Sequence, residues 1–152
     1  MRIYLNVSCL NRPFDDQEQT RIRLEAAAVG MIFERFDAGD WVHVSSEIAM
    51  IEIDATADAR RRERVRLLLP ESGQIVMLSP EIIARGEAIT KLGFKSADAL
   101  HVASAEARKA DVLLSCDDRF CKTAERQASE LRVAVWNPLD WLGEVEDATH
   151  AR

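Results

Sequence analysis

The sequence is short of several features that define other classes of protein, and each shortage excludes something. No apolar run comes near the roughly 18 residues that crossing a membrane requires, so we expect no membrane association. Cysteine is scarce, and the three present show no metal-type pairing and follow no apolar secretory leader. Cys9, Cys116 and Cys121 are therefore interpreted as structural thiols of a cytoplasmic protein, because a reducing compartment keeps cysteines unpaired.

Positive charge is also in short supply. The chain has 20 Lys and Arg against 26 Asp and Glu, which gives a formal net charge of −6 at pH 7. That balance argues against a protein that coats nucleic acid through bulk electrostatics, so any such contact must be local. One local candidate is a run with five arginines in seven positions, which is either a solvated helix face or a patch that contacts phosphates. Its members are Arg60, Arg61, Arg62, Arg64 and Arg66.

The glycine-based motifs of common α/β enzymes are absent. No G-x-G-x-x-G follows a predicted strand, no G-x-x-x-x-G-K-[ST] occurs, and there is no G-x-S-x-G elbow. Dinucleotide-binding, P-loop and serine-hydrolase modules are therefore unsupported. Internal repeats, low-complexity tracts and interdomain linkers are not found either.

The composition is that of one ordinary globular domain. A chain of 152 residues, of which 47% are hydrophobic and 30% charged, can bury roughly 70% of the surface that its unfolded form exposes. We expect a single domain over residues 1–143 and a flexible tail over residues 144–152.

Short apolar, β-branched runs alternate with longer helical patterns along the chain. The alternation predicts a three-layer α/β/α fold, a parallel sheet between two layers of helices joined by right-handed crossovers. In the first helix, apolar residues repeat at three- and four-residue steps until Gly39, and Ser96 is predicted to cap the fourth helix. Strands are predicted at residues 2–6, 41–45, 74–78, 111–115 and 131–136. Helices are predicted at residues 18–38, 46–69 (one helix or two), 80–92, 96–109 and 118–130.

Four polar residues fall where such a sheet brings side chains to one edge. Asn6 ends the first strand and Asp117 follows the fourth. Asp98 lies near the start of the helix that leads into the fourth strand, and Glu52 lies within about two turns of the second strand's end. In an open parallel sheet these positions meet outside the carboxyl ends of the strands. Crowded carboxylates repel one another, so the cluster predicts a hard divalent cation, Mg²⁺ or Mn²⁺.

Four segments of the chain resemble the signature blocks of PIN domains, in order and at fitting intervals. Within that family the chain is most similar to prokaryotic VapC-type toxins, which are Mg²⁺-dependent ribonucleases held in check by a cognate antitoxin. The resemblance implies a five-stranded parallel sheet of order 3-2-1-4-5, flanked by helices. The four segments are residues 3–16, 46–52, 96–103 and 114–120.

The resemblance also implies roles for individual residues. Glu52, Asp98 and Asp117 match catalytic acids that hold one or two Mg²⁺ or Mn²⁺ ions. Ser8 matches the small hydroxyl residue that supports the site. Asn6 is a departure, because PIN domains place a metal-binding aspartate there. An amide still offers a carbonyl oxygen but removes one negative charge, so we expect weaker metal binding. The implied reaction is in-line attack of water on an RNA phosphodiester, which leaves a 5′-phosphate.

Two functions stay open at this point. The first is a metal-dependent endoribonuclease, the toxin of a toxin–antitoxin pair, with RNA as substrate and a cognate antitoxin and a second copy of the chain as partners. Apolar helix faces near Ile82, Ile83 and Ile89 are candidates for those protein contacts, or for plain core. The second, suggested by Asn6, is a catalytically weakened or inactive PIN fold that binds nucleic acid or protein without cutting.

Several charged or titratable residues near the expected site each allow two interpretations. Arg12 and Lys95 are either phosphate contacts or ordinary surface charges. His101, three residues after Asp98 on one helix face, is interpreted as a hydrogen-bonded structural residue rather than a general base. Asp15 or Asp16 could supply a further metal ligand, but a solvated loop before a helix explains both more simply.

Overall fold

Five parallel strands form the central sheet of the protein. A computed structural model describes residues 1–150, and in it the strand order is β3-β2-β1-β4-β5. All four neighbouring pairs run parallel, and Tyr4 of the central strand is paired with Val44 on one side and Leu113 on the other. The predicted sheet and its order are confirmed. The strands are β1 (Arg2–Leu5), β2 (Val42–Ser46), β3 (Ile75–Val76), β4 (Val112–Leu114) and β5 (Ala134–Trp136).

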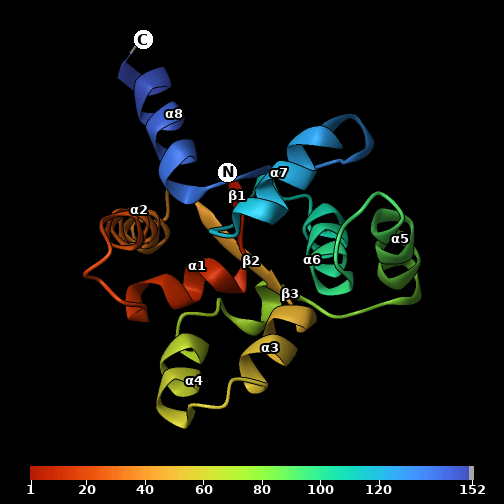
Figure 1. Ribbon diagram of the computed structural model, residues 1–152, viewed down its shortest axis with the longest axis horizontal. Coiled ribbons are helices and arrows are strands. Elements are labelled where there is room, and N and C mark those ends of the chain that lie inside the picture. Colours follow the sequence, from red (N-terminus) through yellow and green to blue (C-terminus); the bar gives the residue numbers. More distant parts are fainter. Residues whose placement is uncertain (151–152) are drawn as a thin grey trace.

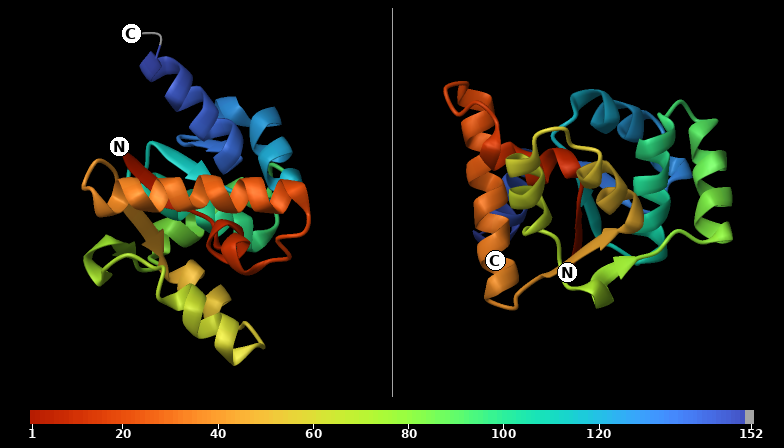
Figure 2. Two further views of the ribbon diagram at one scale, coloured as in Figure 1. Left: turned by 90° about the vertical axis from the view of Figure 1, so that its left-hand side faces the viewer. Right: turned by 90° about the horizontal axis from the view of Figure 1, so that it is seen from below.

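Helices cover both faces of this sheet and enclose two hydrophobic cores. Figure 1 shows α1 and α2 on one side of the sheet and α5 and α6 on the other, and Figure 2 shows α2 and α5 flanking it from a second direction. The predicted three-layer arrangement is therefore confirmed. One core contains residues of α1 (Val7–Asn11), α2 (Thr20–Asp37), α3 (Glu47–Asp54), α4 (Ala59–Arg66) and α8 (Pro138–His150). The other contains residues of α5 (Pro80–Thr90), α6 (Ser96–Ala107) and α7 (Asp118–Arg126).

The alternation of side chains along β1 divides the strand between the two cores. Ile3 and Leu5 pack into the core that contains α2, whereas Tyr4 packs into the core that contains α6. All three side chains are fully buried, as expected for the central strand of a parallel sheet covered on both faces. Tyr4 thus brings a hydroxyl group into an interior that is otherwise mostly apolar.

Polar side chains set where several helices begin. Ser46 and Ser79 each accept a hydrogen bond from a backbone N–H in the first turn, at the starts of α3 and α5. The prediction that Ser96 caps α6 is wrong: Lys95 occupies the cap position without a side-chain hydrogen bond, and Ser96 is the first helical residue. Gly39, with φ of +79°, follows the end of α2 as predicted.

Several helical boundaries differ from the predicted ones. The stretch over residues 46–69 is two helices, and Asp58 caps the second of them by accepting hydrogen bonds from two backbone N–H groups. α7 ends at Arg126 rather than near residue 130, because a turn of 3₁₀ helix follows it. α1 was not predicted, since five residues are too few to show a helical period. Single 3₁₀ turns occur at Arg12–Phe14, Ser72–Gln74 and Ala128–Glu130.

The C-terminal segment is helical where an irregular tail was expected. Residues 144–152 were predicted to be a flexible tail, but α8 continues through residue 144 to His150, and residues 151–152 lie outside the described part of the chain. Trp141 and Leu142 are buried, and Val145 packs against the same core. These apolar residues lie on one face of the helix and anchor it, which explains the difference. The domain boundary at residue 143 stays a prediction.

Helix α5 exposes less apolar surface than the sequence suggested. Ile82 and Ile89 are buried in the core, which leaves Ile83, 45% exposed, as the apolar residue of this group that faces solvent. No helix within residues 1–150 has both the length and the apolar character needed to cross a lipid bilayer.

Candidate metal site

The amide of Asn6 lies where the central strand ends, and it already has a structural task. Its backbone N–H donates to the carbonyl oxygen of Leu114 at 2.9 Å, which extends the pairing of β1 with β4. Its side-chain oxygen accepts a hydrogen bond from the backbone N–H of Ser8 at 3.2 Å and so caps α1. The side chain is nearly buried, with 6% of the residue exposed. Asn6 therefore lies at the end of the central strand, as predicted, and the N–H of Ser8 occupies one lone pair of its side-chain oxygen.

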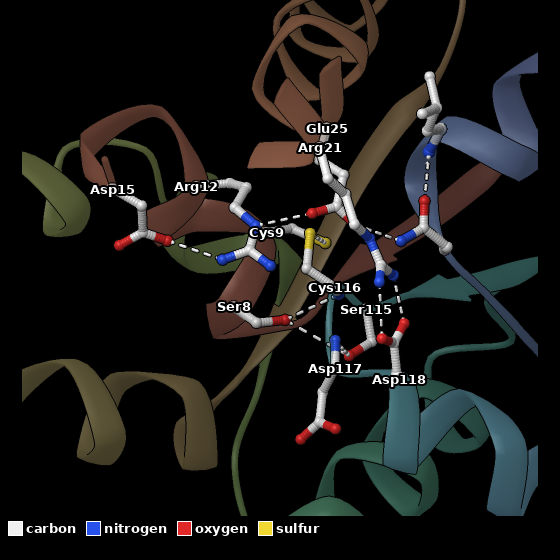
Figure 3. Close-up of polar contacts among 12 residues, drawn as sticks. Ser8, Cys9, Arg12, Asp15, Arg21, Glu25, Ser115, Cys116, Asp117 and Asp118 are labelled. Carbon is white, nitrogen blue, oxygen red and sulfur yellow. Dashed lines mark hydrogen bonds and ion pairs between the residues drawn. The ribbon is translucent and has the colours of Figure 1, made fainter. Parts of the chain in front are cut away.

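Asp117 is held by the loop that joins β4 to α7. One of its carboxylate oxygens accepts hydrogen bonds from two backbone N–H groups and caps α7. Its own N–H donates to the hydroxyl of Ser115 at 3.1 Å, and the hydroxyl of Ser8 accepts from the N–H of Cys116 at 3.0 Å. Figure 3 shows the two serines side by side behind this loop, with the Asp117 carboxylate pointing away from them. Ser8 thus contacts the loop that carries Asp117, and its supporting role in a metal site stays a prediction.

Asp98 and Asp117 line one small hollow at the starts of α6 and α7. Asp98 is half-buried, and burial raises its pKa above the usual range; the negative charge of Asp117 raises it further, and that of Glu52 adds to the effect. Lys95 lines the same hollow and acts in the opposite direction. Two of the predicted acids are therefore together, and they repel each other.

Glu52 approaches this pair from α3, but its side chain is engaged elsewhere. One of its carboxylate oxygens, Oε1, is hydrogen-bonded to Nε2 of His101, which is buried on α6 one turn after Asp98. The Glu52 side chain is 37% exposed, so it lies at the rim rather than in the interior. The interpretation of His101 as a hydrogen-bonded residue of the helix agrees with this contact.

The chemistry of these donors suits a divalent cation, but the donors are not spaced closely enough to enclose one. The donors are carboxylate and amide oxygens, which suit Mg²⁺ or Mn²⁺, and the repulsion at Asp98 is what a cation would relieve. Within residues 1–150, however, no three Asp, Glu, His or Cys side chains are grouped closely enough to hold a metal ion. Asp98 and Asp117 are the residues that would hold it first, with Glu52 as a third ligand from the rim.

Arg12 is not a free surface charge as one interpretation supposed. Its guanidinium donates to Glu25 at 2.9 Å and to Asp15 at 3.0 Å. Asp15 also accepts from Arg61 at 2.7 Å, so it is engaged in ion pairs rather than with the predicted metal ligands. Lys95 is exposed and lines the same hollow as Asp98, and its contact with phosphate stays a prediction.

The arginine run on α4 divides between structural contacts and solvent. Arg61 reaches the 3₁₀ turn at Arg12–Phe14 and donates to the carbonyl oxygen of Phe14 at 2.6 Å, and Arg62 donates to the carbonyl oxygen of Thr56 at 2.9 Å. Arg66 pairs with Asp54 at 2.5 Å. Arg60 and Arg64 are exposed, so the run is partly a structural set and partly a solvated face.

Two features near the candidate site were missed from the sequence. Glu25 is fully buried in α2 and accepts hydrogen bonds from Arg12 and from Asn137. Its position four residues before Val29, on the buried face of the helix, was an available signal. Arg119, exposed and lining the hollow of Asp98 and Asp117, was missed because nothing in the sequence marks it as different from other arginines.

A larger hollow of about 520 Å³ lies between α7 and β5, where Leu131, Val135 and Trp136 form part of an apolar wall. None of the predicted site residues lines it. Its size alone therefore gives no reason to move the candidate site from the hollow of Asp98 and Asp117.

Comparison with known proteins identifies the family. Residues 4–126 match the family model of the PIN domain, so the chain belongs to the PIN domain family. Among solved structures it is similar to a chain in the crystal structure of VapBC2 from Rickettsia felis bound to a DNA fragment from their promoter. The TM-score is 0.56 at 14% sequence identity, over 90% of this chain and 98% of that chain. At that identity the likeness concerns the fold. No curated protein matches the chain significantly.

Proposed function

We propose that the protein is a metal-dependent endoribonuclease, in which Asp98, Asp117 and Glu52 hold Mg²⁺ or Mn²⁺. One observation carries the proposal: Asp98 and Asp117 share a hollow at the carboxyl edge of the sheet, and the pKa of Asp98 is raised by burial and by the charges of the other two acids. Crowding negative charges in a partly buried place costs stability unless a cation offsets it. Membership of the PIN family supports the same conclusion.

Each residue of the hollow has a task in this proposal. When bound, Mg²⁺ or Mn²⁺ supplies activation of a water for in-line attack on a phosphodiester and stabilisation of the departing oxygen. Asp98 and Asp117 bind the cation, while Ser8 and Ser115 keep the Asp117 loop in place. Two exposed cations at the hollow, Lys95 and Arg119, contact the RNA phosphates. Cleavage leaves a 5′-phosphate.

The same proposal makes the protein the toxin of a toxin–antitoxin pair in the cytoplasm. The fold likeness to a chain of the VapBC2 complex supports it. Its partners are then a cognate antitoxin and a second copy of the chain, with Ile83 as an exposed apolar residue available on α5. Light scattering coupled to size-exclusion chromatography tests the homodimer, and a small DNA-binding protein encoded next to this chain would be the expected antitoxin.

The second candidate is a PIN fold with little or no turnover, and the state of Asn6 favours it. The amide oxygen caps α1, and the predicted ligands do not form a three-acid group within the described residues 1–150. A protein of this kind binds RNA or a partner protein without cutting it.

Metal affinity and RNA cleavage, measured on four versions of the chain, separate the two candidates. They are the natural chain, Asn6→Asp, Asp98→Asn, and Asp37→Asn as a control for an exposed acid at the end of α2. Mn²⁺ binding is measured calorimetrically and cleavage on labelled RNA. Cleavage by the natural chain and the control, lost in Asp98→Asn, supports the nuclease. Cleavage that appears only in Asn6→Asp supports the second candidate, and absence of Mn²⁺ binding in every version rejects the metal site.

A further inference from the structure

Three buried side chains behind the candidate site, Ser46, Tyr4 and His101, form a continuous hydrogen-bond network that ends at Glu52. The hydroxyl of Tyr4 lies 2.5 Å from the hydroxyl of Ser46 and 2.6 Å from Nδ1 of His101. Nε2 of His101 is bonded to Oε1 of Glu52. Tyr4 and Ser46 are fully buried and His101 is 1% exposed, so water does not compete for these bonds. The network connects β1, β2, α6 and α3.

The donor in each of these bonds follows from the kinds of groups involved. An ionised carboxylate only accepts, so the hydrogen between Glu52 and His101 belongs to Nε2. A neutral ring with hydrogen on Nε2 accepts at Nδ1, and therefore the Tyr4 hydroxyl donates to it. Burial raises the pKa of Tyr4 above its usual range, which keeps its hydroxyl hydrogen in place as a donor.

The hydrogen bonds at Tyr4 and Ser46 follow from the same reasoning. With its hydrogen given to His101, the Tyr4 oxygen accepts from the hydroxyl of Ser46. The Ser46 oxygen in turn accepts from the backbone N–H of Ala49 at 3.2 Å, the bond that caps α3. Every hydrogen is used once.

We infer that His101 is a positioning residue for Glu52, and that Tyr4 and Ser46 help to hold its Nε2–H tautomer. The inference rests on the proposed metal-dependent activity, in which Glu52 is the third ligand. His101 lies one turn after Asp98 on α6, so the bond ties the Glu52 carboxylate to the helix that carries the first ligand. Because the bond occupies Oε1, Oε2 is the oxygen that would remain available to a cation. A carboxylate ligand held by an outer hydrogen bond binds metal more tightly than a free one.

The first test reads the tautomer directly and needs neither metal nor RNA. Nitrogen-15 spectra of the imidazole rings should show His101 with hydrogen on Nε2 in the natural chain. Tyr4→Phe keeps the ring in the core but removes the donor, so a population with hydrogen on Nδ1 should appear. His43 gives an internal reference in the same spectra, because its Nε2 has no hydrogen-bond partner. Hydrogen on Nδ1 of His101 in the natural chain would overturn the inference.

The second test measures the effect on the ligand. His101→Leu should weaken Mn²⁺ binding by about 10- to 100-fold, and His101→Gln, which can still donate from its amide, should recover most of it. Thermal melts of both variants show that they are folded. Unchanged Mn²⁺ binding in His101→Leu together with weakened binding in Asp98→Asn rejects the positioning role alone. Unchanged binding in both variants rejects the proposed metal site and the positioning role with it.

Discussion

Arg12 and Glu25 form an ion pair in which the carboxylate is completely enclosed and the guanidinium mostly covered. The Glu25 side chain is 1% exposed and the Arg12 side chain 21%, and the distance from Arg12 Nε to Glu25 Oε1 is 2.9 Å. Asn137 donates to the other oxygen of Glu25. Arg21 lies 3.5 Å from that same oxygen (Figure 3). The pair therefore ties α2 to the segment after α1 and to the residue before α8.

Loss of the Glu25 charge should destabilise the fold strongly. Glu25→Gln leaves the Arg12 guanidinium without its buried partner, so the free energy of unfolding should fall by about 2–4 kcal/mol. Glu34→Gln, at an exposed position of the same helix, is the matched control and should change it by less than about 0.5 kcal/mol. Urea unfolding followed by circular dichroism measures both. Equal stability of the two variants would show that the ion pair contributes nothing.

Two substitutions at Asn6 should separate its contribution to stability as a helix cap from the effect of its missing negative charge on metal binding. Asn6→Ala removes the acceptor for the Ser8 N–H and should cost about 1 kcal/mol of stability without improving metal binding. Asn6→Asp keeps an acceptor at the cap and adds a negative charge, so stability should be retained while Mn²⁺ affinity rises on the order of tenfold. Calorimetric titration and urea unfolding of the two variants give both quantities. Weaker Mn²⁺ binding by Asn6→Asp would contradict the assignment of this position to the site.

The fold should lose stability in mild acid because of His43. Burial lowers the pKa of this histidine from 6.5 to about 4, so the unfolded chain binds a proton more readily than the folded one. Stability should therefore be highest above pH 6.5 and fall as the pH drops toward 4, with a loss of about 2 kcal/mol at pH 5. In His43→Leu that part of the pH dependence should disappear, which urea unfolding at pH 5 and pH 7.5 would show. A variant with the same pH profile as the natural chain would rule out His43 as the cause.

The thiols should react slowly in the folded protein. Burial raises the pKa of Cys121 to about 12, and Cys9 is fully buried with its pKa raised well above the usual range. Only a thiolate attacks a disulfide reagent, so at pH 8 Cys121 should react about 100-fold more slowly than free cysteine. Absorbance after addition of an aromatic disulfide reagent follows the rate, and unfolding in urea should release all three thiols. Fast labelling of Cys121 in the native state would contradict this environment.

A glycine beside the candidate site should resist replacement. Gly93 has φ of +107° and lies just before α6, so Gly93→Ala should cost about 1–3 kcal/mol through backbone strain. Gly30, exposed in α2 with free space around it, is the opposite case: Gly30→Ala should stabilise by about 0.5–1 kcal/mol. Thermal melts of the two variants should therefore move in opposite directions. A melting temperature of Gly93→Ala equal to that of the natural chain would show that the loop relaxes.

The parts of the fold that were predictable depend on local pattern. The three layers are confirmed, because apolar β-branched runs and helical periods alternate clearly along the chain; the strand order, which the resemblance to PIN domains implied, is confirmed as well. Asn6 and Asp117 were placed correctly at the ends of β1 and β4, since the end of a parallel strand fixes the edge that its next residue reaches. α8 was not predicted, because its anchors, Trp141 and Leu142, become informative only once the partner surface on α2 is known.

The features of the site that could not be predicted are contacts between side chains that are far apart in the sequence. His101 could be read as a hydrogen-bonded residue, but its partners Tyr4 and Glu52 lie 97 and 49 residues away in sequence. Arg12 was interpreted as a phosphate contact or a surface charge, because nothing in the sequence marks its ion pair with Glu25. A charge on its own in a sequence does not show whether the fold supplies a counter-charge, and this is what decides between a binding residue and a structural one.

The cap formed by Asn6 bears on how this protein can change over generations. Aspartate and asparagine accept the same backbone N–H, and their codons differ at one nucleotide, so a carboxylate could return to this position without disturbing the start of α1. A lineage that carries the amide therefore stays within one mutational step of the fully acidic form, and any restraint on its activity is easily reversed by selection.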